Sequence, residues 1–284
     1  MKRLLSWTIA GLAMTCVAGA ARAQDRTSAN TVLALANRVA PTSAALSQDC
    51  RSTWVAGDKY RHPLRGIRRA VRAGREPHVL AIGSSSTVGT GASAPANSYV
   101  AKLENDLDSA FTGVSFDVEA RGVGGEMAEG QSARMQRAVL ETKPDLVLWQ
   151  VGTNDAINHV DINRFKTCLR RTLAWLAANN FDVMLVDPQY GEALAQDARY
   201  VEVVAAIAEI AAEQHVLLVD RFEAMRQLSA AHGDAFYLAS DKLHLNDTGH
   251  RCMAEQLARA IVAGVLLADK DAITVGATLA QPRP

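Results

Sequence analysis

The sequence lacks the features that several broad classes of protein require. Its 30 lysines and arginines are matched by 30 aspartates and glutamates, so no basic bias indicates nucleic-acid binding. Its four cysteines have no zinc-binding spacing. No internal repeat and no low-complexity linker divides the chain. With 284 residues and an ordinary apolar and charged content, the chain is long enough for one large α/β domain, with two small domains as the alternative.

The amino terminus has the pattern of a secretory signal peptide. Lys2 and Arg3 precede a mainly apolar stretch, and the A-R-A sequence at 21–23 is a cleavage signal, so we expect cleavage before Gln24 and a periplasmic or secreted protein. A membrane anchor is the alternative, but polar and glycine residues dilute the run, and no stable membrane insertion is expected after cleavage. Thr15 is a poor residue for a lipoprotein signal at Cys16. The expected divisions are a signal peptide at 1–23, an N-terminal extension at 24–77, a main domain at 78–268 and a C-terminal tail at 269–284.

Strand and helix patterns alternate from residue 78 onward. Short apolar runs predict strands at 79–82, 114–120, 146–151, 183–186 and 216–219. Amphipathic segments predict helices at 97–111, 128–141, 163–178, 198–213, 222–232 and 247–267, and residues from 272 read as a loose tail. This alternation predicts a three-layer α/β/α sandwich around a mostly parallel five-stranded sheet. A basic helix is expected at 63–73, and a solvated surface explains its arginines better than nucleic-acid binding does.

A serine-rich turn follows the first predicted strand. The run Val79–Ile82 gives way to Gly83, three serines and Thr87. A hydroxyl held in this turn lies at the carboxyl end of the sheet, where open α/β sheets bind ligands. The alternative is a plain strand-to-helix turn, and the stretch by itself does not separate the two.

Two further turns are expected at the same edge of the sheet. Gly152-Thr153-Asn154-Asp155 follows the third strand, and an asparagine amide there is one accepted donor of an oxyanion hole. The second strand leads to a glycine-rich turn at 122–126, whose backbone N–H groups can point freely into a site. Its spacing matches no dinucleotide or P-loop motif, so phosphate binding is the weaker interpretation. A turn-forming Asn-Asp pair is the structural alternative for Asn154.

Asp241 stands three residues before His244, close enough to reach the Nδ1–H of the imidazole. Such a pair fixes the tautomer and leaves Nε2 free to act as a base. A metal site is the alternative, but further ligands at suitable spacing are missing. His250 is a rival base, which we expect to be exposed or structural. His159 and His232 have no acid placed as Asp241 is.

Taken together, these stretches resemble the SGNH hydrolases, also called GDSL esterases and lipases, over about 78–267. The resemblance implies a flavodoxin-like fold, Ser85 as nucleophile, His244 as base and Asp241 as its partner. It also implies an oxyanion hole formed by Ser85, Gly125 and Asn154. Ser84 and Ser86 are rival nucleophiles. Two positions depart from the family: Ser84 replaces the usual acid, which is expected to change local hydrogen bonding, and Leu245 replaces a proline, which is expected to loosen the geometry slightly.

Three cysteines remain after signal cleavage, and an odd number in an exported protein suggests one pair and one free thiol. Cys168 lies beside the apolar face of a predicted helix, where it can be buried as a small hydrophobe. Related SGNH proteins with such an extension carry cysteines at the places of Cys50 and Cys252. We therefore predict a Cys50–Cys252 disulfide and a free Cys168.

The sequence predicts an exported serine hydrolase that cleaves carboxylic esters, with short acyl groups favoured because the loops are short. No cofactor and no metal are expected, and the substrate is a small-molecule or saccharide ester. One alternative is an acyltransferase that uses the same site on a cell-envelope sugar. Another, from a different class, is a carbohydrate-binding protein without activity. Neither the natural substrate nor the oligomeric state can be read from the sequence.

Overall fold

The computed structural model describes residues 46–51 and 62–279, with side chains as far as Ala268. The expected signal peptide and most of the expected N-terminal extension lie outside the described residues. Two parts of the extension are described: the short 3-10 helix η1 (Gln48–Cys50) and the basic helix α2 (Arg65–Arg72). The remaining elements belong to the α/β domain.

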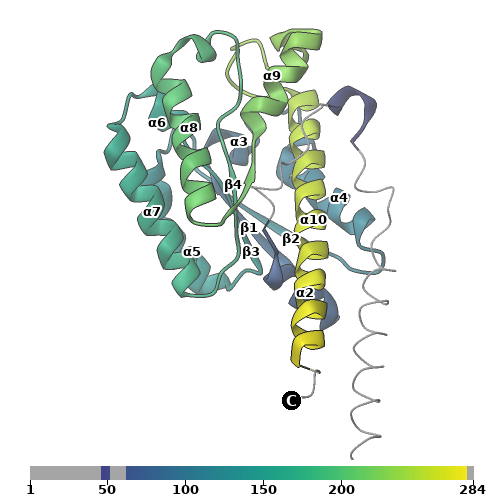
Figure 1. Cartoon of the computed structure of the whole chain (residues 1–284). Helices are drawn as coiled ribbons and strands as arrows, with labels where there is room; N and C mark the ends of the chain where they lie inside the picture. The colour runs from purple at the N-terminus through teal and green to yellow at the C-terminus, as the bar shows by residue number, and fades with distance from the viewer. Residues whose placement is uncertain (1–45, 52–61, 280–284) are drawn as a thin grey trace, which may run out of the picture. The chain divides into compact units, whose positions relative to one another are not determined.

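A parallel five-stranded sheet forms the centre of this domain (Figure 1). Its strands are β1 (His78–Gly83), β2 (Asp117–Gly122), β3 (Leu146–Gln150), β4 (Val183–Val186) and β5 (Leu217–Val219). They are ordered β2-β1-β3-β4-β5, and every neighbouring pair is parallel. The direction of winding changes between β1 and β3, and α/β sheets bind ligands outside the carboxyl ends of the strands at such a point. The predicted fold class is confirmed.

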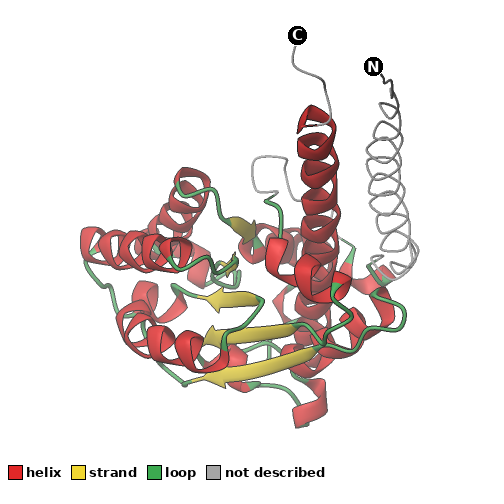
Figure 2. Cartoon of the chain, turned by 90° about the horizontal axis from the view of Figure 1, so that it is seen from below, coloured by secondary structure: helices red, strands yellow, loops and turns green. Residues whose placement is uncertain are grey.

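Two layers of helices cover the sheet (Figure 2). On one face, α7 packs against both α5 and α8; on the other, α10 packs against α4 and α2 (Figure 1). The helices are α3 (Ser85–Val88), α4 (Tyr99–Ala110), α5 (Ala128–Thr142), α6 (Thr153–Ile157), α7 (Ile162–Ala178), α8 (Ala198–Glu213), α9 (Arg221–His232) and α10 (Asp247–Leu279), and the short 3-10 turns are η3 (Pro95–Asn97), η4 (Leu194–Gln196) and η5 (Asp234–Phe236).

The composition of each strand reflects its place in the sheet. The central strand β3 is buried along its whole length, as expected where helices cover both faces. Its Trp149 is fully buried, and the indole N–H donates to Gln131 Oε1 at 2.7 Å. The edge strand β2 is more polar and carries Asp117, Glu119 and Arg121 at alternate positions. The composition of β1 and β3 therefore suits their places in the middle of the sheet, next to the point where the direction of winding changes.

Two predicted boundaries were wrong. Strand β2 begins at Asp117 rather than at 114, because residues 111–114 form a turn in which Val114 N–H bonds to the Phe111 carbonyl. Residues 272–279 do not form a loose tail but continue α10 to Leu279. No helix among the described residues is both long and apolar enough to cross a membrane.

A disulfide attaches the short segment around η1 to α10. It joins Cys50 to Cys252, whose Cα atoms are 5.0 Å apart, and Cys168 is buried with a free thiol. This is the pairing that the resemblance favoured. Next to the bond, Arg251 donates to Asp49 at 2.8 Å, and Ser47 N–H donates to Glu255 at 2.7 Å.

Candidate active site

The serine turn lies where β1 ends and α3 begins. Ser84 and Ser86 are 2% and 4% exposed, so of the three consecutive serines Ser85 is the more accessible. The chain turns sharply here because Gly83 has no Cβ: an added one would lie 2.1 Å from Thr87 Oγ1. Thr87 is in turn held by Tyr99, with the two hydroxyl oxygens 2.8 Å apart.

A chain of hydrogen bonds links Ser85, His244 and Asp241. His244 Nε2 lies 3.1 Å from Ser85 Oγ, and His244 Nδ1 lies 2.6 Å from Asp241 Oδ2. The His244 side chain is 21% exposed and that of Asp241 is 51% exposed. These distances are within hydrogen-bond reach for a nucleophile, its base and the group that orients the base.

The loop that carries His244 is fixed by its own backbone. Asp241 Oδ1 accepts the N–H groups of Leu243 and His244 at 3.0 and 2.9 Å. These bonds, after the one to the His244 ring, help to lower the pKa of Asp241 to about 2. The replacement of a proline by Leu245 leaves this position anchored, because Leu245 is buried and forms an antiparallel bridge with Leu238.

Gly91 brings the loop after α3 against the His244 loop, a contact between positions far apart in the sequence. A Cβ at Gly91 would lie 2.2 Å from the Leu245 carbonyl and 3.1 Å from His244 Cβ. Gly91 also has a φ of 92°, which favours glycine. A glycine following the nucleophile turn is the only sequence signal for this contact.

Asn154 lies at the start of α6, beyond β3, and faces the glycine-rich turn. Its Nδ2 donates to the Glu126 carbonyl at 3.0 Å, which fixes the amide plane and leaves its second N–H for another acceptor. Gly125 has a φ of 74°, and the space where a Cβ would stand is open for 4 Å. The next residue, Asp155, accepts the Ala128 N–H with both oxygens at 3.1 Å, and burial raises its pKa to about 6.

Arg134 links the glycine-rich turn to the end of β1, a role that the sequence did not reveal. Its guanidinium binds the Glu126 carboxylate at 2.7–3.1 Å and donates to the Gly83 carbonyl at 3.1 Å. The same residue, Glu126, therefore receives Arg134 on its side chain and Asn154 on its backbone. At Ser84, which stands where the family has an acid, the backbone N–H bonds to Gln150 Oε1 at 3.3 Å.

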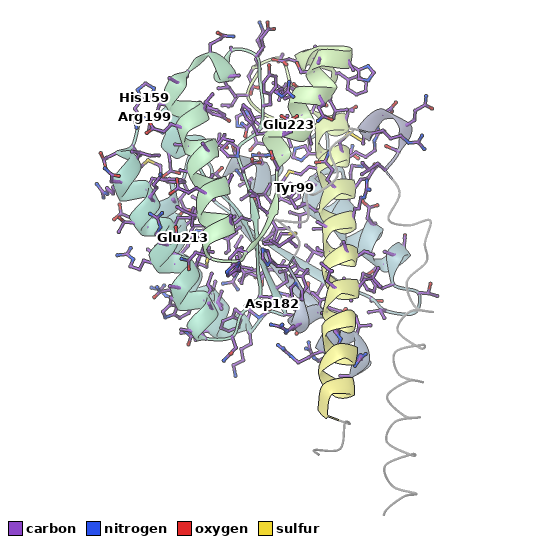
Figure 3. All side chains as sticks on the ribbon, in the orientation of Figure 1. Tyr99, His159, Asp182, Arg199, Glu213 and Glu223 are labelled. Carbon is purple, nitrogen blue, oxygen red and sulfur yellow. A yellow bond between two sulfur atoms is a disulfide. The ribbon has the colours of Figure 1, made fainter. Side chains whose placement is uncertain are left out.

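The other histidines considered have different surroundings. His250 is fully buried: Nδ1 accepts the Tyr99 N–H at 3.1 Å and Nε2 lies 3.2 Å from the Thr90 carbonyl, so its role is structural. His159 has no acid placed as Asp241 is, but folding brings the distant Asp197 within 2.9 Å of it. His159 lies at the outer edge of the molecule (Figure 3), whereas the ring of His232 stacks on Phe236.

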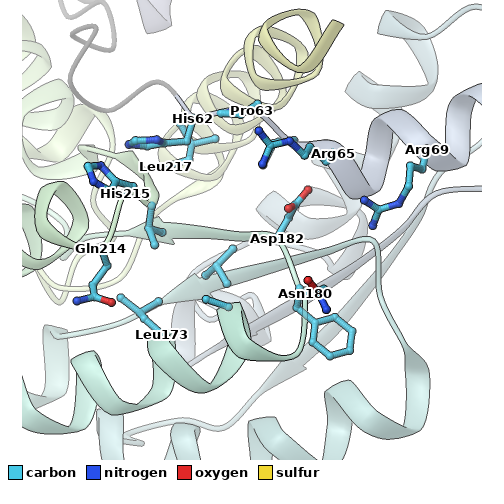
Figure 4. Close-up of a pocket in the computed structure, with 15 residues that line it drawn as sticks. His62, Pro63, Arg65, Arg69, Leu173, Asn180, Asp182, Gln214, His215 and Leu217 are labelled. Carbon is cyan, nitrogen blue, oxygen red and sulfur yellow. The ribbon is translucent and has the colours of Figure 1, made fainter. Parts of the chain in front are cut away.

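A cavity of about 480 Å³ lies at the opposite, amino-terminal edge of the sheet (Figure 4). It is lined by the first residues of β4 and β5 and by α2, with Arg65, Arg69, His62 and His215 among its polar groups. Asp182 at its margin accepts the Gly66 N–H at 2.6 Å. The described residues hold no group of three or more His, Cys, Asp or Glu side chains arranged to bind a metal ion.

Comparisons with known proteins find a lipase-like family and esterases as the relatives of this chain. The model of the non-GDSL lipase-like family matches residues 52–267. An acetylxylan esterase from Geobacillus stearothermophilus is 27% identical over 195 residues, which cover 63% of this chain and 84% of that protein. Among solved structures, a catalytic mutant of an acetylxylan esterase from the same organism has a TM-score of 0.58 at 22% identity, covering 65% of this chain and 94% of that one. The acetyl xylan esterase AlAXEase also has a TM-score of 0.58, at 24% identity, covering 65% and 99%.

The structural neighbours share the fold of this chain. Together with the sequence relative, they identify this chain as an SGNH, or GDSL-type, carboxylic-ester hydrolase. Within that class, the chain belongs to the non-GDSL lipase-like family, whose model covers most of its length.

Proposed function

We propose that this protein is an exported esterase that removes short acyl groups, acetyl above all, from a saccharide, with Ser85 as its nucleophile. The observation that carries the proposal is the 3.1 Å separation between His244 Nε2 and Ser85 Oγ, with Asp241 bonded behind the imidazole. The name of the 27% identical relative, an acetylxylan esterase, supports an acetylated saccharide as the substrate class.

The reaction begins when His244 Nε2 takes the Ser85 proton and Ser85 Oγ attacks the acyl carbon. The tetrahedral intermediate collapses, the bond to the sugar oxygen breaks, and His244 gives its proton to the departing alkoxide. Water then attacks the acyl-enzyme while His244 accepts its proton, and the acid leaves as Ser85 regains a hydrogen. Asp241 remains a carboxylate and stabilises the imidazolium throughout.

The negative charge that develops on the carbonyl oxygen needs donors that are already in place. We assign this role to the backbone N–H groups of Ser85 and Gly125 and to the second N–H of Asn154. The open space beside Gly125 and the anchored amide of Asn154 support the assignment.

Short connections around Ser85 support a preference for short acyl groups. After β3, helix α6 takes up much of the connection and leaves residues 158–161 before α7. That segment is too short for a large apolar lid over a fatty chain. The test is hydrolysis of an acyl series from acetyl to palmitoyl, together with acetylated polysaccharides. A preference for chains beyond about ten carbons contradicts this part of the proposal.

Export is supported by the signal-like amino terminus and by the Cys50–Cys252 disulfide, since such bonds persist in oxidising compartments. Cell fractionation and the amino-terminal sequence of the mature protein test it, with Gln24 as the expected first residue.

The mechanism itself is tested by labelling with a fluorophosphonate, which should modify Ser85, and by treatment with EDTA, which should have no effect. Inactivation by EDTA with recovery on adding zinc would make Asp241 and His244 metal ligands instead. Acyl transfer that outcompetes hydrolysis when a sugar acceptor is supplied would favour the acyltransferase, and absence of labelling would favour a binding protein.

A further inference from the structure

Gln189, in the loop after β4, occupies an unusual position between two loops of the active site. Its side chain is buried, with the residue 2% exposed. The amide oxygen Oε1 accepts the Thr153 hydroxyl at 2.9 Å, and the amide nitrogen Nε2 donates to the Leu243 carbonyl at 3.0 Å. The two ends of one planar amide therefore hold residues that are 90 positions apart in the sequence.

Each of these partners is the immediate neighbour of a residue in the proposed mechanism. Thr153 precedes Asn154, the proposed oxyanion donor, and Leu243 precedes His244, the proposed base. The amide of Gln189 thus spans the separation between the turn that carries the donor and the loop that carries the base.

The orientation of this amide is set by a buried arginine. Arg221, 1% exposed, donates from Nη2 to Gln189 Oε1 at 3.0 Å and from Nε to the Asp187 carbonyl at 3.0 Å. A flipped amide would place its N–H groups against the guanidinium, donor against donor, and would turn its oxygen toward the Leu243 carbonyl. Arg221 therefore holds the oxygen toward Thr153 and the nitrogen toward Leu243.

The backbone of Gln189 is also fixed, because the Tyr200 hydroxyl donates to its carbonyl at 2.8 Å. A buried polar side chain whose groups are all paired is rigid, since breaking any bond leaves a buried group without a partner. Such a side chain can keep two loops at a constant separation while substrate enters and leaves.

We propose that Gln189 is a positioning residue that sets the placement of Asn154 relative to His244, with Arg221 fixing its amide. The inference rests on the proposed function, because it assigns meaning to Asn154 and His244. It does not require Gln189 to touch substrate. Misplacement of catalytic groups by about 1 Å can cost up to about 10²-fold in rate, so a small shift of either loop is measurable.

The sharpest test removes the Thr153 hydroxyl, which bonds to Gln189 and also faces the Tyr200 hydroxyl. Thr153→Val deletes the hydroxyl but keeps the branched shape, and it should lower kcat about tenfold with little change in KM. Thr153→Ser keeps the hydroxyl and should stay within about threefold of the wild type. Thr172→Val is the matched control, because Thr172 is also buried and its hydroxyl lies 2.6 Å from that of Ser132, between α5 and α7. It should leave kcat unchanged.

A double variant separates positioning from a general loss of structure. In the Asn154→Ala background the donor is absent, so Thr153→Val should lower kcat less than about twofold further. Gln189→Glu is the second probe: its carboxylate still accepts from Arg221 and Thr153 but cannot donate to Leu243. It should lower kcat in both backgrounds, because its effect reaches the His244 loop.

Fluorophosphonate labelling of the wild type comes first. If the wild type is not labelled at Ser85, the proposed function fails and this inference fails with it. If it is labelled, equal kcat losses in Thr153→Val and Thr172→Val overturn the inference alone. An undiminished loss from Thr153→Val in the Asn154→Ala background overturns it as well.

Discussion

The two edges of the sheet differ in what they offer a ligand. At the carboxyl edge lie the turns after β1 and β3 and the His244 loop. His244 bonds to Ser85 at 3.1 Å and to Asp241 at 2.6 Å, and the Asn154 amide bonds to the Glu126 carbonyl at 3.0 Å. At the amino edge, a cavity of about 480 Å³ lies between α2, α7 and β5. Its acidic group, Asp182, holds the first turn of α2 (Figures 3 and 4).

A cavity alone therefore does not locate the candidate active site of this protein. A well-formed pocket is a usual first hypothesis for a binding site, but here the candidate catalytic residues lie on the edge of the sheet opposite this cavity. Parallel strands direct their carboxyl ends, and the helix N-termini that follow them, toward one edge. The polar groups of the candidate site gather at that edge, whereas the Asp182 carboxylate at the other edge holds a helix.

Removal of the proposed nucleophile, Ser85, should have the largest effect on activity. Ser85→Ala should lower turnover by about 10⁶-fold, as removal of a nucleophilic serine does in a comparable mechanism, and should abolish fluorophosphonate labelling. Ser86→Ala, which removes a buried hydroxyl one residue later, is the matched control and should remain labelled. Full labelling of Ser85→Ala would move the nucleophile to Ser84 or Ser86.

The second largest effect is expected from loss of the Asn154 amide. Asn154→Ala should lower kcat by about 10²–10³-fold, the usual loss for one oxyanion donor. Asn179→Ala is the control, because Asn179 donates to a backbone carbonyl at an exposed helix end and lies outside the proposed site. Steady-state kinetics on an acetyl ester decides the point, and a drop below about fivefold for Asn154→Ala removes it from the oxyanion hole.

A change in the Arg134–Glu126 ion pair behind the glycine-rich turn should lower kcat less than loss of the Asn154 amide does. Arg134→Lys keeps the charge but loses the planar fork that binds Glu126 and Gly83 together, so kcat should fall about tenfold. The control is Arg170→Lys, which alters a similar fork on Glu213 at the surface of α7. If both variants keep wild-type kcat, Arg134 contributes nothing to the arrangement of the site.

A change at the amino edge should affect stability and not catalysis. Asp182→Ala removes the acceptor of the Gly66 N–H, and we expect a loss of about 1 kcal/mol in the free energy of unfolding, as for other helix caps. Denaturant unfolding and kcat are measured on the same sample. A large fall in kcat with intact folding would contradict a purely structural role for Asp182, because it would make the amino edge functional.

The smallest effect is a contrast in pH dependence between one aspartate at each edge. The hydrogen bond to His244, with two backbone N–H bonds, lowers the pKa of Asp241 to about 2, so its contribution to stability is complete above the unfolded pKa of about 4 and is lost as pH falls toward 2. Burial raises the pKa of Asp182, so its contribution is complete below about 4 and is lost as pH rises through the raised value.

The stabilities of the Asp241→Asn and Asp182→Asn variants, relative to the wild type, should therefore depend on pH in different ways. The destabilisation by Asp241→Asn should shrink as pH falls from 4 to 2, and it should be small because that side chain is half exposed. Asp182→Asn should become more stable relative to the wild type as pH rises from 4. Urea unfolding from pH 2 to well above pH 4 measures both effects, and parallel pH profiles of the two variants would contradict the assignment.

Most strands and long helices, and the local part of the candidate site, can be read from the sequence, whereas the short helices α3 and α6 cannot. Buried strands appear as short apolar runs, and the Asp241–His244 pair is readable because a spacing of three residues brings the two side chains together in one turn. The glycine at 83 and the asparagine at 154 mark turns at strand ends for the same reason: their conformations depend on adjacent residues. The SGNH resemblance then supplied the roles, and the fold class followed from the alternation of strand and helix.

Contacts between distant positions depend on the tertiary fold and could not be read from the sequence. Ser85 and His244 meet across 159 residues, and Gln189 joins Thr153 to Leu243, because the register of the sheet and the packing of α9 and α10 bring these loops together. The roles of Gly91 and Arg134, the acid beside His159 and the continuation of α10 were hidden for the same physical reason. A backbone turn is governed by its own few residues, whereas a contact between loops depends on how every element between them packs.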